Sequence, residues 1–111
     1  MELLKAEANN NQTLHVQLFG DFDAKGSREA QTEIDHIIHN DGHHEVEVDL
    51  KQVHFMDSSG IGAIVYLYKR LVERERVMRI ENATGQPLQI MKLLRIGQAI
   101  PINTHISNEY L

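Results

Sequence analysis

Residues 53–62 read Val-His-Phe-Met-Asp-Ser-Ser-Gly-Ile-Gly, and the rest of the chain can be interpreted outward from this stretch. Before it, residues 45–50 alternate apolar and polar, as a half-buried strand does. After it, apolar residues recur at helical spacing, which predicts an amphipathic helix over residues 58–75. A strand therefore ends and a helix begins within the stretch. In parallel sheets this edge is where ligands and partners usually bind.

The N-terminal part of the chain has the same two periodicities. Residues 14–19 alternate apolar and polar, and we expect them to form a hairpin with residues 3–6 across a turn at the asparagines of 9–11. Apolar residues at helical spacing then predict a helix over residues 24–39, with Asp23 as its N-cap.

The C-terminal part predicts three further elements. Residues 77–80 form a candidate strand, and Pro87, a residue suited to the first turn of a helix, opens a helix that continues to Arg95. Gly97 is expected to cap that helix. Residues 100–106 form a last, weaker candidate strand. Strands that alternate with helices predict an α/β fold, with a mixed, mostly parallel sheet and helices packed on it.

Length and composition limit the classes of function. The 111 residues suit a single domain over 1–111. The chain has no cysteine, which excludes a disulfide framework, a thiol nucleophile and Cys-ligated metal sites. Its formal net charge of -5 disfavours nonspecific binding to nucleic acid or to an anionic membrane. With no signal peptide and no apolar run of membrane-spanning length, we expect a cytoplasmic protein, and the acidic surface favours a monomer.

Ser58 and Ser59 are the candidate chemical groups of the central stretch. They fall in the first turn of the predicted helix, where backbone N–H groups lack intrahelical partners. A phosphoryl group there would meet those donors and the positive end of the helix dipole. A structural role explains the same residues, because Asp57 or Ser58 would serve as an N-cap and the glycines would permit close packing.

Enzymatic and metal-binding functions find little support. Neither serine lies in a Gly-x-Ser-x-Gly motif, no phosphate-binding Gly-rich loop with Lys-Ser/Thr is present, and we expect no catalytic residue and no cofactor. His36 and His39 share a face of the helix predicted over 24–39, and His43 and His44 follow. No carboxylate-plus-histidine motif accompanies them, so we expect solvated histidines and no metal. The basic residues of 69–79 alternate with glutamates and predict a solvated helix face.

The stretch from Phe55 to Gly62, followed by Tyr68 and Lys69, resembles the signature of STAS-domain anti-sigma-factor antagonists. In that family a strand leads into Asp-Ser-Ser-Gly-Leu-Gly. Residues 20–23, Gly-Asp-Phe-Asp, are similar to a Gly-Glu-Leu-Asp turn at the mouth of the same surface, and residues 46–50 are similar to the family's third strand. The element order also agrees, so the resemblance covers residues 1–107. The chain departs from the family where Lys25-Gly26-Ser27 replaces a frequent Thr, and its end at Leu111 leaves the family's C-terminal helix short or missing.

The resemblance implies a partner switch. The unmodified protein would bind an anti-sigma factor or a serine kinase of that type, phosphorylation of Ser58 would release it, and a serine phosphatase would reverse the reaction. Ser59 is the less favoured acceptor, with a hydrogen bond inside the turn as its other role. The implied partner-binding residues are Asp21, Asp23, Asp57, Ser58, Ser59, Gly60 and Ile61.

Two alternatives stay open within the same family. The chain would be a constitutive interaction module in a signalling assembly, or a regulator of biofilm or exopolysaccharide output that acts on a client other than a sigma-factor system. The presence or absence of phosphate on Ser58 separates these from the switch.

Overall fold

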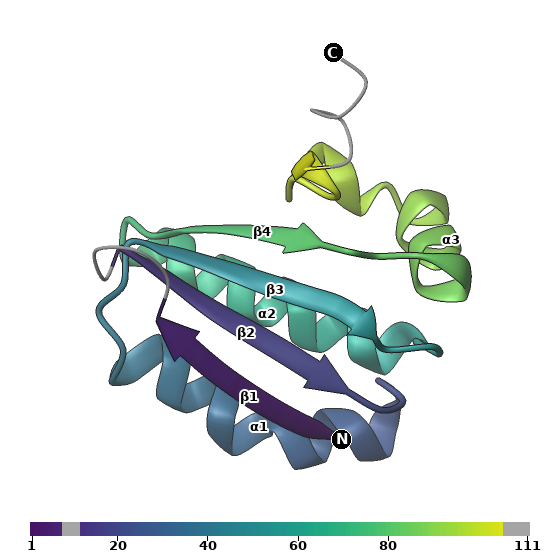
Figure 1. Ribbon diagram of the computed structural model, residues 1–111, viewed down its shortest axis with the longest axis horizontal. Helices are drawn as coiled ribbons and strands as arrows, with labels where there is room; N and C mark the ends of the chain where they lie inside the picture. The colour runs from purple at the N-terminus through teal and green to yellow at the C-terminus, as the bar shows by residue number, and fades with distance from the viewer. Residues whose placement is uncertain (8–11, 106–111) are drawn as a thin grey trace.

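The computed structural model describes residues 1–7 and 12–105 and contains one four-stranded sheet. The strands lie in the order β1-β2-β3-β4; β1 is antiparallel to β2, and the other two pairings are parallel (Figure 1). This confirms the predicted α/β fold with a mixed, mostly parallel sheet. The elements in chain order are β1 (Glu2–Glu7), β2 (Thr13–Phe19), α1 (Ala24–His39), β3 (Glu45–Gln52), α2 (Ser58–Glu73), β4 (Val77–Glu81), α3 (Gly85–Leu93) and the short 3-10 helix η2 (Ile96–Gln98).

The two long helices, α1 and α2, cover the same face of the sheet (Figure 1). Each buries an aliphatic stripe against the strands, as the helical spacing predicts. Fully buried side chains of this layer include Ile37, Leu50, Leu71 and Ile80. At about 25 cal/mol per Å² of apolar surface, each such side chain contributes roughly 1.5–3 kcal/mol to folding. The core therefore lies between the sheet and these two helices, and it fixes the strand ends from which the loops project.

The segment after β4 differs from its prediction. The third helix begins at Gly85 and ends at Leu93, so Pro87 is its third residue. Arg95, not Gly97, takes the left-handed conformation that ends it, with φ at 57°. The strand predicted over residues 100–106 is wrong for its described part, because only Ile102 makes an isolated parallel bridge, to Ile80. Asn103, with φ at 56°, then turns the backbone out of the extended conformation.

Strand β3 is buried on both faces over its central part. Val46, Val48 and Leu50 point into the aliphatic core. Glu47 and Asp49, on the opposite face, are also buried. The alternation of residues 45–50 predicts a single buried face, so the second, polar one is a feature that the pattern does not reveal.

The basic stretch 69–79 is only in part a solvated face. Arg70 pairs with Glu73 at 2.9 Å on the exposed side of α2. Arg76 is buried, and its guanidinium donates to the carbonyl oxygens of His43 at 2.6 Å and Ile37 at 2.9 Å. Burial lowers the pKa of Arg76 below the ordinary value of arginine, and the charge of Asp41 opposes that shift. Arg76 thus bonds a carbonyl group left open at the end of α1 and a second one in the loop before β3.

Two predicted features fall wholly or partly beyond the described residues. The hairpin turn at 9–11 lies outside them, as does Ile106 at the end of the predicted last strand. Within 1–7 and 12–105, no helix is both long enough and apolar enough to cross a membrane.

Candidate functional site

The turn after β2 and the turn after β3 lie against each other at one edge of the sheet. Phe22 and Met56 form an isolated parallel bridge between them. The N–H of Phe22 donates to the carbonyl of Phe55 at 2.9 Å, and the N–H of Asp57 donates back to the carbonyl of Phe22 at 3.3 Å. The two segments that the sequence marks as candidate sites, 20–23 and 55–60, therefore form one surface. We call this surface the Ser58 edge.

Two glycines allow this close approach. A Cβ on Gly60 would lie 2.2 Å from the carbonyl oxygen of Phe22, and a Cβ on Gly26 would lie 2.2 Å from the carbonyl oxygen of Asp21. Both contacts are with backbone atoms, which cannot rotate away as a side chain can. Gly60 and Gly26 are thus required by the way the first turns of α2 and α1 pack on the loop between β2 and α1.

Asp23 and Asp57 cap the two helices that start at this edge. The carboxylate of Asp23 accepts from the N–H of Gly26 at 2.8 Å. The carboxylate of Asp57 accepts from the N–H groups of Ser59 at 2.9 Å and Gly60 at 3.3 Å. Asp23 was predicted as an N-cap, and for the second helix it is Asp57 rather than Ser58 that takes this position.

Ser58 and Ser59 differ in exposure. Ser58, the first residue of α2, is exposed, and Ser59 is half-buried. Asp57 already occupies the N–H groups of Ser59 and Gly60 through its side chain, and that of Ile61, at 3.0 Å, through its carbonyl. A group attached to the hydroxyl of Ser58 would therefore project away from the helix and would not accept hydrogen bonds from these backbone N–H groups.

The remaining predicted site residues are divided between the surface and the interior. Asp21 is exposed at the tip of its turn. Gly60 is buried, and Ile61, 7% exposed, belongs to the aliphatic core. Ser27 is half-buried, and its hydroxyl oxygen, fully buried, has no hydrogen-bond partner among the described residues. Side-chain contact with a partner is thus available to Asp21 and Ser58, whereas Gly60 and Ile61 support them from beneath.

Gln86, which the sequence did not indicate, holds the loop before Ser58. Its side-chain oxygen accepts from the N–H of Met56 at 2.8 Å, and its side-chain nitrogen donates to the carbonyl of the same residue at 2.7 Å. Gln86 lies in the first turn of α3, thirty positions along the chain from Met56. The side-chain amide of Gln86 makes the two bonds to the backbone of Met56 that a neighbouring strand would otherwise make. No local sequence motif indicates this contact, because the two residues are far apart in the chain.

Phe55 is a second residue that was not expected to bind a partner, although it lies in the stretch 53–62. Phe55 is 43% exposed and directly precedes the Met56–Asp57 turn. An exposed aromatic side chain next to polar groups is typical of residues that anchor protein partners.

The electrostatics of the edge are acidic. No described lysine or arginine forms an ion pair with Asp21, Asp23 or Asp57. Among the described residues, none hydrogen-bonds the hydroxyl of Ser58 in the manner of a base that would activate it. The arrangement therefore presents an exposed hydroxyl beside carboxylates and without a neighbouring base.

The histidines considered as metal ligands have separate partners. His36 lies 3.0 Å from the ammonium of Lys5, and His39 lies 2.9 Å from the guanidinium of Arg74. His43 pairs with Glu7 at 3.3 Å, and His44 is exposed. These four side chains, all within the described part of the chain, do not converge on one point.

Comparison with known proteins relates both the sequence and the fold to one family. The sequence model described as "STAS domain" matches residues 5–109. An anti-sigma factor antagonist of Thermotoga maritima is 14% identical with a TM-score of 0.82, over 97% of this chain and 91% of that one. The phosphorylated form of SpoIIAA from Bacillus, described as a cell fate determinant, is 18% identical with a TM-score of 0.69, over 96% of each chain. An anti-sigma factor antagonist of Mycobacterium paratuberculosis is 14% identical with a TM-score of 0.77, over 93% of this chain and 86% of that one. No curated protein sequence matches the chain.

Proposed function

Since this chain belongs to the STAS domain family, we propose that it is a phosphorylation-controlled regulator that switches partners. The unphosphorylated protein binds an anti-sigma factor or a serine kinase of that type. Phosphorylation of Ser58 releases the partner, and a serine phosphatase restores binding. The protein acts by binding and release and not by catalysis.

The observation that carries the proposal is the position of Ser58. Its hydroxyl is exposed at the first residue of α2, on the surface made by the two turns. A kinase needs an accessible hydroxyl, and the half-buried Ser59 meets this need less well. The phosphorylated form of SpoIIAA is among the similar structures reported above, which supports a phosphorylated state for a chain of this fold.

Electrostatics supports release on phosphorylation. A phosphate adds about -1.5 to -2 charges at neutral pH. Asp57 already accepts from the free amides of the first turn, so the helix offers the phosphate little compensation. Asp21 and Asp23 belong to the adjoining turn, and a partner interface closed over this group would pay for like-charge repulsion and desolvation. Each ~1.4 kcal/mol of that cost weakens binding tenfold.

The partner surface extends from Ser58 to Phe55 and Asp21. The ring of Phe55 supplies apolar area, and the exposed carboxylate of Asp21 suits a basic residue on the partner. We expect Phe55→Ala to weaken binding of the unmodified protein about tenfold, because buried aromatic anchors commonly contribute more than ~1 kcal/mol.

The test compares two neighbouring serines. Wild-type protein, Ser58→Ala and Ser59→Ala are purified from native cells, and intact mass and phosphosite mapping are recorded for each. We expect a phosphate in the wild type and in Ser59→Ala, and none in Ser58→Ala. Affinity for the captured partner is then measured for Ser58→Ala and Ser58→Asp, and we expect Ser58→Asp to bind at least tenfold more weakly.

Three results would contradict the switch. Phosphate that persists in Ser58→Ala would place the modification elsewhere, Ser59 first. Equal affinity of Ser58→Ala and Ser58→Asp for the partner would remove Ser58 from control of binding. Protein that carries no phosphate under any growth condition would favour a constitutive STAS interaction module in a signalling assembly, or a regulator of biofilm or exopolysaccharide output.

A further inference from the structure

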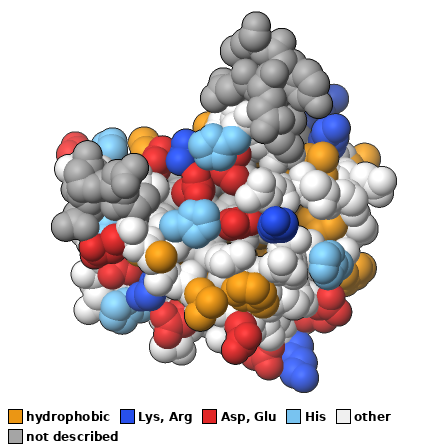
Figure 2. Space-filling model, viewed as in Figure 1, with side chains coloured by type: hydrophobic (Ala, Val, Ile, Leu, Met, Phe, Trp, Pro, Cys, Tyr) orange, Lys and Arg blue, Asp and Glu red, His pale blue; other side chains and the backbone are white. Residues whose placement is uncertain are grey.

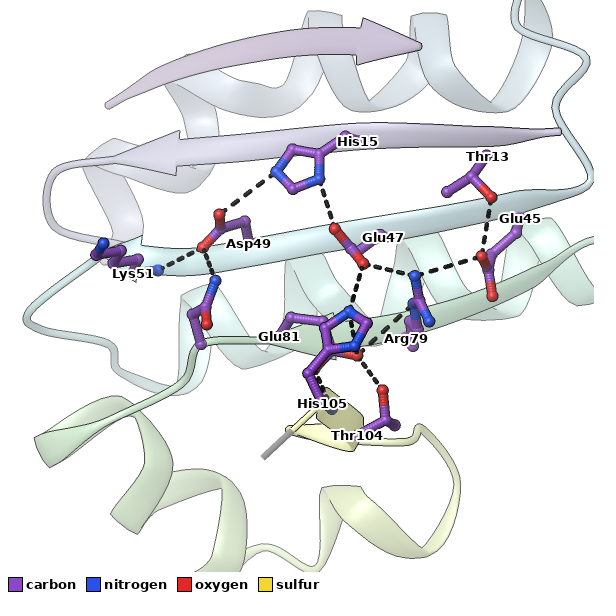
Figure 3. Close-up of polar contacts among 11 residues, drawn as sticks. Thr13, His15, Glu45, Glu47, Asp49, Lys51, Arg79, Glu81, Thr104 and His105 are labelled. Atoms are coloured by element: carbon purple, nitrogen blue, oxygen red, sulfur yellow. Dashed lines mark hydrogen bonds and ion pairs between the residues drawn. The ribbon is translucent and has the colours of Figure 1, made fainter. Parts of the chain in front are cut away.

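The face of the sheet opposite α1 and α2 carries a cluster of acidic and histidine side chains. Figure 2 shows these side chains gathered over the middle of that face. They come from β2, β3 and β4 and from the segment after η2 (Figure 3). We propose that Glu47, Glu81 and His105 form a binding site for a divalent transition-metal ion with the ligand preferences of zinc. This site is separate from the Ser58 edge, and it does not depend on the function proposed for that edge.

The ligand atoms lie at distances that suit one small ion. His105 Nε2 is 3.3 Å from Glu47 Oε1 and 3.8 Å from Glu81 Oε2. All three residues can place one ligand atom within 4.8 Å of the others. Zinc bonds to nitrogen and carboxylate oxygen measure about 2.0–2.2 Å, so neighbouring ligand atoms of a tetrahedral site are about 3.4 Å apart. The observed spacings need only a small adjustment to reach that value.

Both carboxylates are held by further hydrogen bonds, as metal ligands usually are. His15 Nδ1 lies 2.5 Å from Glu47 Oε2, the oxygen that does not face His105. The backbone N–H of His105 donates to Glu81 Oε1 at 3.3 Å. One oxygen of each carboxylate is therefore oriented by a donor, while the other faces the imidazole of His105. The hydroxyl of Thr104 also donates to Glu81 Oε2 and holds that oxygen in place.

The cluster has an excess of negative charge. Glu45, Glu47 and Glu81 share one guanidinium, that of Arg79. Asp49, which accepts from the side-chain amide of Asn82, lies beside them on β3. Three of the carboxylates belong to buried residues, and Asp49 is directly opposite Glu81 in the register of β3 and β4. Like charges at such positions destabilise a sheet, and burying several carboxylates around one guanidinium costs desolvation free energy. A divalent cation would relieve both effects.

Arg79 now occupies part of the space that the ion would take. Its Nη2 lies 2.6 Å from Glu47 Oε1. Its buried Nε is 3.6 Å from Glu81 Oε2 and has no hydrogen-bond partner among the residues that the structure describes. The same Nη2 is 3.6 Å from Glu45 Oε1, so Glu45 is an alternative partner within reach. The metal ion and the guanidinium therefore compete for Glu47. When the ion binds, the side chain of Arg79 pairs with Glu45 instead.

The donor set indicates the class of metal. One imidazole with two carboxylates suits zinc and neighbouring transition metals, whereas calcium and magnesium prefer oxygen ligands alone. Because His105 belongs to the segment after η2 and the glutamates belong to the sheet, the bound ion would also fasten that segment to β3 and β4.

The test is a zinc titration by calorimetry on four matched proteins. We expect the wild type to bind Zn²⁺, and His105→Ala to lose that binding event or to bind at least tenfold more weakly. His54→Ala, which removes an exposed histidine that is not among the three proposed ligands, should bind as the wild type does. Arg79→Gln should bind Zn²⁺ more tightly than the wild type, because the competing guanidinium is gone.

A stability measurement keeps the proposal testable if a variant folds poorly. We expect Zn²⁺, and not Mg²⁺ or Ca²⁺, to raise the melting temperature of Arg79→Gln by more than that of the wild type. His105 is exposed, so His105→Ala should fold and should show no zinc-dependent rise. Zinc binding that is identical in His105→Ala and the wild type would overturn the proposal, as would a wild type that binds no zinc.

Discussion

The close approach of the two turns at the Ser58 edge can be tested by adding a methyl group to a single glycine. Gly60→Ala places a Cβ 2.2 Å from the carbonyl oxygen of Phe22, and a backbone atom must move. We expect a loss of about 1–3 kcal/mol in the free energy of unfolding, the usual cost of overpacking. Gly62→Ala, two residues along the same helix, meets no atom within 4 Å and should gain up to about 1 kcal/mol from helix propensity. Urea denaturation of both variants measures this, and equal stability would contradict the close approach of the two turns.

The two functions of Asp57, helix capping and negative charge, can be separated by substitution. Asp57→Ala removes the acceptor of the Ser59 and Gly60 amides, and we expect a loss of roughly 0.5–2 kcal/mol in the free energy of unfolding. Asp57→Asn keeps a capping oxygen and should remain within about 0.5 kcal/mol of the wild type. Chemical denaturation compares the three proteins. Equal losses in Asp57→Asn and Asp57→Ala would show that the charge, not the cap, stabilises the helix start.

At the scale of elements, the contact between α3 and the loop before α2 depends on one side chain. Gln86→Ala leaves both the N–H and the carbonyl of Met56 without their partner, and we expect a loss of about 1–3 kcal/mol in the free energy of unfolding. Gln89→Ala, an exposed position of the same helix, should change stability by less than ~0.5 kcal/mol. Thermal and urea unfolding measure both, and hydrogen exchange at Met56 reports the local loss. Protection at Met56 that is unchanged in Gln86→Ala would show that this contact does not hold the loop.

The elements that the sequence predicted well are those with a local physical cause. Helix α1 has its predicted bounds, because Asp23 caps its start and its aliphatic stripe continues to its last turn. Helix α2 starts at the predicted residue and ends two residues early, with Val72 49% exposed. The prediction of a last strand was wrong because its apolar residues do not form a ladder. Ile100 packs in the core, and only Ile102 pairs with a strand. Apolar content alone does not distinguish these cases.

Across the whole molecule, Arg76 joins the end of α1 to the start of β4. Replacing it by Met leaves the carbonyl groups of Ile37 and His43 without their donor, and we expect a loss of about 1–3 kcal/mol in the free energy of unfolding. Arg74→Met, two residues earlier and exposed, should cost less than ~0.5 kcal/mol. Urea unfolding followed by both fluorescence and circular dichroism checks this. Equal losses in the two variants would mean that burial of Arg76 contributes nothing specific.

The candidate sites show how far sequence reasoning reaches at this scale. Asp57, Ser58 and Gly60 were predicted together because they are contiguous and occupy one turn. Gln86 and the Glu47–Glu81–His105 cluster were not, because the residues in each contact come from separate elements that only the tertiary fold brings together. Arg76 was misassigned for the same reason, since a basic residue among charged neighbours gives no sign that its guanidinium is buried.

The glycine contacts beneath the Ser58 edge also bear on how such a protein diversifies. Gly26 and Gly60 hold the backbone of the two turns, while the side chains above them, at Asp21, His54, Phe55 and Ser58, are exposed. Substitutions of the side chains that a partner would contact should therefore leave the backbone of the two turns unchanged. Duplicated copies of the gene could acquire new partners by drift at these four positions without losing the fold. A library randomised there, with both glycines kept, should consist mostly of folded proteins.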